Sequence, residues 1–286
     1  RPVPEHVKAA KQRKPGLVFR NEKLEPEDKY LVKKDTWNLK EGLNVFANSL
    51  MAYIFIELII IMFVWTQTGL DEALSADIEL NMTLILISQV PGVVFGIIPL
   101  WYLFSSNHDI SKLGLAKDPK LILFALIIGF LGGLGLLAIN YFSDFINSVL
   151  YDVGLEFLDI SDYMQEENKV LQGADLFSSV LLILLVGLQA IANEIVFRGV
   201  LHNSLKSSDK FQEDLTGKIS IIIIVALAYS LIYTLFTLPI GIVFFFLNFL
   251  VFIFLGILYE INGNLYNSII ASTFYNVLIL VLMLFF

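Results

Sequence analysis

Residues 240–261 read IGIVFFFLNFLVFIFLGILYEI, and Glu260 is the only charged side chain in this stretch. A helix needs about 20 mostly apolar residues to cross a hydrocarbon core roughly 30 Å thick, so the stretch predicts a membrane span. Comparable stretches predict seven spans, at about 43–67, 82–104, 120–142, 177–204, 219–238, 240–261 and 265–286. The sequence therefore predicts an all-α, polytopic transmembrane bundle of about seven to eight helices.

The composition supports a membrane protein. Hydrophobic residues make up 57% of the 286 residues and charged residues 16%, and the mean hydropathy is +0.74. These values lie far outside the range of ordinary soluble chains. The chain contains no cysteine, which excludes disulfides, thiolate metal ligands and a thiol nucleophile. The net charge of −8 comes largely from acidic linkers, and we expect no binding to nucleic acid.

Lysine and arginine are concentrated before the first predicted span and in the linkers around 105–119 and 205–218. The alternate linkers are acidic, and the longest of them, 143–176, contains Lys169 as its only cation. Because cytoplasmic loops carry the excess of lysine and arginine, the N-terminus is predicted to be cytoplasmic. We accordingly divide the chain into a basic cytoplasmic tail, 1–42, and a membrane domain, 43–286.

Three local patterns predict how the spans begin, pack and end. Trp37 and Lys40 have the composition of an interfacial anchor just before the first span. Four glycines of the third span should let a neighbouring helix approach closely: Gly129, Gly132, Gly133 and Gly135. In the segment 143–176, apolar residues at helical spacing predict an amphipathic helix on the outer surface: Phe145, Val149, Leu150, Val153, Phe157 and Leu158.

Glu194 and Arg198 are ionisable residues inside a predicted span, where unpaired charges are costly. Their four-residue separation places both on one helix face, with the carboxylate N-terminal to the guanidinium, which favours an ion pair. Glu57 in the first span has no evident partner in the sequence, and it could face a cavity or pair with a polar group.

Residues 192–199, Ala-Asn-Glu-Ile-Val-Phe-Arg-Gly, closely resemble the Glu-Glu-x-x-x-Arg motif of the CAAX protease and bacteriocin-processing family of intramembrane proteases. Downstream, 230–236 resembles the family's Phe-x-x-x-His helix, and 270–276 resembles its His-x-x-x-Asn motif. The similarity covers about 180–280. It implies the family's helical fold of about eight helices, with a short segment possible within 143–176.

The resemblance implies a metalloprotease site whose ligand positions are altered in this chain. In the family, paired glutamates and two histidines bind or position a divalent metal that activates water. Here the first glutamate is replaced by Asn193, and the histidines fall on Phe236 (or its immediate neighbours) and on Ser272. Glu194, Arg198 and Asn276 are retained. His202, one turn beyond Arg198, is expected to be interfacial, so we predict no bound metal and no cofactor.

These departures predict a catalytically inactive family member, a pseudoprotease acting as a scaffold, stabiliser or subunit for a membrane partner. We expect it to contact membrane lipid and to bind a membrane protein through the bundle cavity, the N-terminal tail or 143–176. The alternative is an active intramembrane CAAX-type metalloendopeptidase with an atypical site, for which the retained Glu194 and Arg198 speak.

Overall fold

The computed structural model describes residues 37–68, 80–155, 160–208, 211, 215–237 and 241–285. The predictions for the tail before Trp37, and for Phe157 and Leu158, lie outside these residues. All regular structure in the described part is helical, and seven of its helical segments are long and apolar enough to cross a membrane. The predicted all-α bundle and its seven spans are therefore confirmed.

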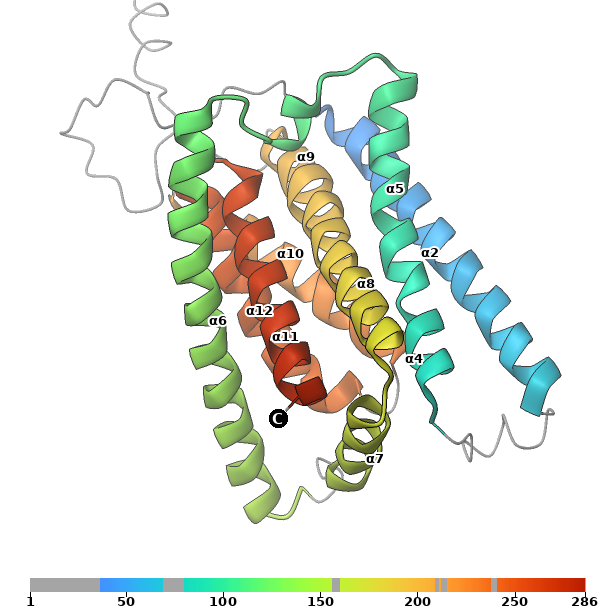
Figure 1. The fold of residues 1–286 in the computed structure, drawn as a ribbon. Coiled ribbons are helices and arrows are strands. Elements are labelled where there is room, and N and C mark those ends of the chain that lie inside the picture. Colours follow the sequence, from blue (N-terminus) through green and yellow to red (C-terminus); the bar gives the residue numbers. More distant parts are fainter. Residues whose placement is uncertain are drawn as a thin grey trace, which may run out of the picture.

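The first two spans form one side of the bundle (Figure 1). Helix α2 (Leu39–Thr68) supplies the first span, and α4 (Met82–Ser88) and α5 (Val90–Ser105) together supply the second. A turn at Gln89 separates α4 from α5, and Pro91 follows it in the first turn of α5, where proline is tolerated. A short 3₁₀ helix, η1 (Ile110–Leu113), lies in the linker that follows.

The third span, α6 (Pro119–Asp152), is 34 residues long and corrects the sequence interpretation. We expected the span to end near 142 and a separate helix to follow, but residues 145–152 continue α6. Asn140 and Asp144 do not end the helix because they hydrogen-bond to each other at 3.1 Å, and Asn140 also accepts from the Tyr275 hydroxyl at 2.8 Å. A helix of this length is about 51 Å long, more than the hydrocarbon core requires.

The segment after α6 contains a separate short helix, α7 (Ser161–Gln172). It lies at one end of the bundle (Figure 1), and Glu166 ties it to the start of the second span by accepting from the Leu80 backbone N–H at 3.3 Å. On this helix, burial raises the pKa of Glu167 and raises the pKa of Tyr163 to about 12.

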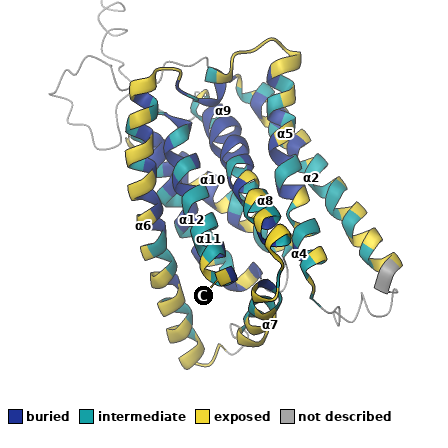
Figure 2. Cartoon of the chain, viewed as in Figure 1, coloured by how far each residue is buried: buried dark blue, intermediate teal, exposed yellow. Residues whose placement is uncertain are grey.

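The fourth span runs through the centre of the bundle as three consecutive segments, α8 (Leu176–Glu194), η3 (Ile195–His202) and α9 (Asn203–Lys206). The last three spans are α10 (Leu215–Phe236), α11 (Gly241–Glu260) and α12 (Leu265–Phe285). All residues of η3 are buried. Exposed residues run along outer helices such as α2 and α6 (Figure 2), and many of them are large and apolar. This distribution is that of a membrane protein, whose outer surface faces lipid.

The glycines of α6 permit close packing against α11 and α12, as predicted. A Cβ added at Gly129 would lie 2.6 Å from Ile270 Cβ, and one at Gly135 would lie 2.7 Å from the Phe254 ring. Trp37 differs from its prediction, because only 1% of its surface is exposed. It packs inside the protein, stacked on Tyr102 with ring centroids 6.1 Å apart, and so does not anchor the chain in the lipid interface.

Candidate functional site

The segment that carries Arg198 is a π-helix, eight residues long and buried throughout. The wider turn of a π-helix is uncommon and is frequently found at functional sites. Glu194, Arg198 and His202 follow one another at four-residue intervals along this central span and are all fully buried. The end of α8 and the π-helix therefore present three ionisable side chains to the interior of the bundle.

Glu194 and Arg198 form the ion pair that their spacing predicts. Arg198 Nη1 donates to Glu194 Oε1 at 2.9 Å, and both side chains have 0% exposure. Arg198 Nη2 also donates to the backbone carbonyl of Phe252 in α11, at 2.7 Å. The guanidinium lies 3.7 Å from the centroid of the Phe252 ring, an arrangement that adds cation–π attraction. Arg198 therefore joins the central span to α11.

Most of the other motif-equivalent positions make their described contacts away from this ion pair. In α12, Asn276 donates to the Ser272 carbonyl at 2.8 Å, one turn earlier in its own helix. The α12 side chain beside Glu194 is Ser268, although its hydroxyl donates to the Leu265 carbonyl at 3.2 Å. Asn193 is half-buried, one residue before the pair.

Phe236 lies at the end of α10, where 37% of its surface is exposed and its ring meets Tyr53 at 5.1 Å. The residue that α10 places beside the ion pair is Tyr229, two turns earlier, whose ring stacks on Phe252 at 3.3 Å. Tyr229 and Tyr233 have the four-residue spacing of the Phe-x-x-x-His motif. That spacing is the signal by which the sequence could have identified them.

The donor set at these positions does not fit a zinc site. Such a site normally uses three protein ligands drawn from imidazole, thiolate and carboxylate. Asn193, Phe236 and Ser272 supply none of these, and the Glu194 carboxylate is engaged by Arg198. Within the described ranges, no group of three or more histidine, cysteine, aspartate or glutamate residues is placed to hold a metal ion.

A second buried ionic site, the Glu260 cluster, was not anticipated from the sequence. It consists of Glu260 with His202, Lys206 and Lys218. Glu260 Oε1 accepts from Lys206 Nζ at 2.6 Å and from His202 Nε2 at 2.8 Å, and Lys218 Nζ lies 3.9 Å from Oε2. His202 is thus fully buried, contrary to the expected interfacial position. The buried carboxylate of Glu260 accounts for this, because a buried charge requires paired partners.

Glu57 also has a partner that the sequence did not identify. The Tyr53 hydroxyl, one turn earlier in α2, hydrogen-bonds to the Glu57 carboxyl group, and Glu57 is half-buried. The tyrosine provides a local polar contact for this intramembrane acid, which would otherwise face apolar surroundings.

An apolar groove opens between α8 and α12. It has a volume of about 460 Å³ and is lined by Ile191 of α8 and by α12 side chains from Ile269 to Val281. Thr273 lies in this groove, and its buried hydroxyl oxygen has no hydrogen-bond partner in the described structure. The groove is therefore suited to an apolar occupant from the membrane.

These features define an integral, multi-pass membrane protein with a buried ion pair at the centre of a helical bundle. Residues 175–278 match the family model described as Rce1-like, the type II CAAX prenyl endopeptidase Rce1-like family. The matched segment runs from the start of α8 into α12, and it confirms the resemblance to this family over these residues. The comparisons with curated proteins and with solved structures give no significant match.

Proposed function

We propose that this chain is a catalytically inactive member of the family that serves as a scaffold, stabiliser or subunit for a membrane partner. The observation that carries the proposal is the state of Glu194. Its Oε1 accepts from Arg198 at 2.9 Å with both side chains fully buried, and the same Arg198 donates to the Phe252 carbonyl of α11, so the carboxylate supports a contact between helices. The motif-equivalent positions Asn193, Phe236 and Ser272 offer no further carboxylate or imidazole.

The groove between α8 and α12 supports binding of the partner within the membrane. Its lining is apolar, and it runs along α12 over about three turns, from Ile269 to Val281. Between transmembrane helices, association depends on van der Waals packing and hydrogen bonds, so a groove of this shape offers a transmembrane helix an extended contact. We therefore propose the groove as the contact for a transmembrane helix of the partner.

An active CAAX-type metalloendopeptidase is the second candidate, and one observation favours it. Glu194 Oε2 is buried, and among the described residues no hydrogen bond of ordinary geometry reaches it, although Ser268 lies beside the carboxylate. Such an oxygen could take a metal or a water. A metalloprotease would still need ligands that the aligned positions lack.

One experiment separates the two candidates. The purified chain is incubated with zinc and a prenylated peptide that ends in a CaaX sequence, and cleavage is followed by mass spectrometry alongside Glu194→Gln. We expect the parent and the variant to give the same background. Cleavage by the parent that disappears in Glu194→Gln, together with about one bound zinc per chain, would establish the protease instead.

We also propose that the N-terminus is cytoplasmic. The lysine and arginine asymmetry supports this orientation. The linkers around 112 and 207 lie at the same end of the bundle as the start of α2 (Figure 1), as an even number of intervening spans requires.

A further inference from the structure

We propose that a polar cavity at the beginning of α2 binds the phosphate group of a membrane phospholipid. The cavity has a volume of about 400 Å³, at the lower end of the range for small-molecule sites. Its polar lining comes from Asn38, which precedes α2, from Lys40, Glu41, Asn44 and Asn48 of α2 and from Tyr102 of α5. This cavity is separate from the buried ion pair and from the groove between α8 and α12.

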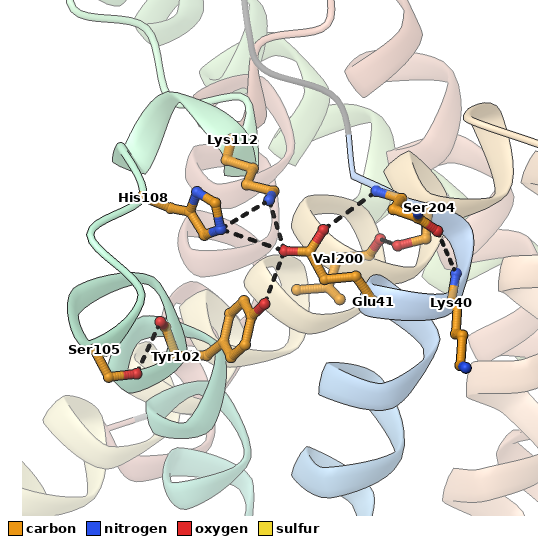
Figure 3. Close-up of polar contacts among 9 residues, drawn as sticks. Lys40, Glu41, Tyr102, Ser105, His108, Lys112, Val200 and Ser204 are labelled. Atoms are coloured by element: carbon orange, nitrogen blue, oxygen red, sulfur yellow. Dashed lines mark hydrogen bonds and ion pairs between the residues drawn. The ribbon is translucent and has the colours of Figure 1, made fainter.

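The charge balance of the cavity favours an anion. The negative charge of the Glu41 carboxylate is paired with Lys112, whose Nζ donates to Glu41 Oε1 at 2.7 Å. The Tyr102 hydroxyl donates to the same oxygen at 2.8 Å (Figure 3). His108 Nε2 lies 3.5 Å from that oxygen. Lys40 also lines the cavity, and within the described part of the chain no ion pair joins it to a carboxylate. Among the described lining residues, Lys40 is therefore a cation besides the Glu41 carboxylate, which Lys112 pairs.

The available donors are side chains, since the helix end is already capped. Asn38 Oδ1 accepts from the Lys40 backbone N–H at 3.0 Å, and Glu41 Oε2 accepts from the Asn38 backbone N–H at 3.4 Å. This reciprocal pattern is that of a capping box. Asn44 and Asn48 are exposed on the following turns and line the cavity together with Lys40, so the lining side chains include amide and ammonium groups. Amide and ammonium donors suit the oxygens of a phosphate.

The walls of the cavity are held in place before any ligand binds. Gly42 lies so close to α9 that an added Cβ would overlap the Ser204 side chain, which fixes the first turns of α2 against the central span. Lys112 packs over the Trp37 ring at 4.8 Å, so η1 and the residues before α2 are joined as well. A preformed site loses less conformational entropy on binding.

The surroundings point to a lipid as the source of the phosphate. The cavity lies in the first turns of a membrane-spanning helix, the level at which headgroups lie. Farther along α2, Met51 and Phe55 are 67% and 64% exposed, so acyl chains can pack below the headgroup. A polar cavity at the start of α2, followed by exposed apolar side chains farther along the helix, matches the arrangement of headgroup and acyl chains in a phospholipid.

The test compares three probes on the detergent-purified full chain: dioctanoyl phosphatidylglycerol, dioctanoylglycerol with the same chains but no phosphate, and glycerol 3-phosphate. Binding is measured by native mass spectrometry and by the rise in melting temperature. We expect only the phospholipid to bind and stabilise the parent. Lys40→Gln should weaken this binding about fivefold, because one cation near a headgroup contributes on that scale. The double variant Asn44→Ala, Asn48→Ala should weaken it too, and Lys40→Arg should bind as the parent does.

Lys120→Gln is the matched control, because Lys120 is an exposed lysine at the same end of the bundle and does not line the cavity. Each variant should melt without lipid within about 2 °C of the parent, since the changed residues are exposed. The proposal is overturned if dioctanoylglycerol binds as well as the phospholipid, or if Lys40→Gln and Lys120→Gln bind equally. Stabilisation by glycerol 3-phosphate alone, to the same extent, would overturn the lipid assignment.

Discussion

The buried pair of Glu194 and Arg198 can be tested by a double-mutant cycle. We expect Glu194→Gln and Arg198→Gln each to destabilise the protein, and the double variant to be more stable than the sum of the two losses predicts. The reason is that each single change leaves an unpaired charge at a site with 0% exposure, whereas the double change removes both charges. Breaking a buried pair in this way typically costs about 3–5 kcal/mol.

The two single variants should lose different amounts of stability. After Glu194→Gln, Arg198 keeps its bond to the Phe252 carbonyl and its contact with the Phe252 ring, so the loss should be about 3 kcal/mol. Arg198→Gln removes these contacts as well as the pairing, and the loss should be about 5 kcal/mol. The double variant retains mainly the cost of the unpaired carbonyl, about 1–3 kcal/mol. The coupling free energy is then several kcal/mol in favour of the pair.

Melting in detergent, followed by intrinsic fluorescence, is a suitable assay. At about 2–4 °C per kcal/mol, Glu194→Gln should melt about 6–12 °C below the parent. Losses that simply add in the double variant would refute the reasoning, since they would mean that the two side chains do not interact. Single variants as stable as the parent that no longer co-purify with its partner would show that the partner reads the pair directly.

Four further outcomes are expected. Single cysteines introduced at Ser111 and Ser208 should label from the cytoplasmic side of the membrane, and one at Ser161 should label from the opposite side. Labelling of the Ser161 position from the cytoplasm would contradict the orientation. Gly129→Ala should cost about 1–3 kcal/mol in a melting experiment, because the new Cβ would lie 2.6 Å from Ile270, whereas Gly187→Ala, with its nearest contact at 3.7 Å, should cost nothing. Glu260→Gln should destabilise the chain by about 3–5 kcal/mol, since Glu260 is 3% exposed and pairs several cations. Asp175→Ala should melt at a lower temperature than the parent at pH 7, and this difference should shrink below pH 3.8. The reason is that hydrogen bonds from Ser178 lower the pKa of Asp175. The stabilisation by the Asp175 carboxylate is therefore present above its ordinary pKa of 3.8 and is lost as the pH falls through the lowered pKa.

Hydropathy was sufficient to locate the spans, because hydrocarbon thickness and backbone hydrogen bonding leave few alternatives to a long apolar helix. It failed at the end of α6. There Asn140 and Asp144 have the polarity of a linker, but they hydrogen-bond to each other within the helix, and Asn140 also accepts from Tyr275 of α12. Whether such a pair ends a span depends on a neighbouring helix, and a single sequence does not show which helix that is.

The candidate site was predictable where its contacts are local. The spacing of Glu194 and Arg198 was enough to predict their ion pair, because both belong to one helix. Phe252 was not predictable as the second partner of Arg198, since the contact uses a backbone carbonyl 54 positions away. His202 was misplaced for a similar reason: its environment is set by Glu260, 58 positions further along the chain.

The two ionic sites together connect the central span to α11. Arg198 and His202 lie one turn apart on the central span, and they bind α11 at Phe252 and at Glu260, so the two helices are joined at both ends of the same stretch. In the metalloprotease arrangement that the family resemblance implies, ligands from separate helices converge on an ion that connects them. Here a guanidinium and an imidazole make the connections directly, and a guanidinium stays protonated under all ordinary conditions. The central helices are therefore joined by direct side-chain contacts, and under the proposed function the apolar groove of α8 and α12 and the cavity at the start of α2 are the surfaces that would contact a partner or a lipid.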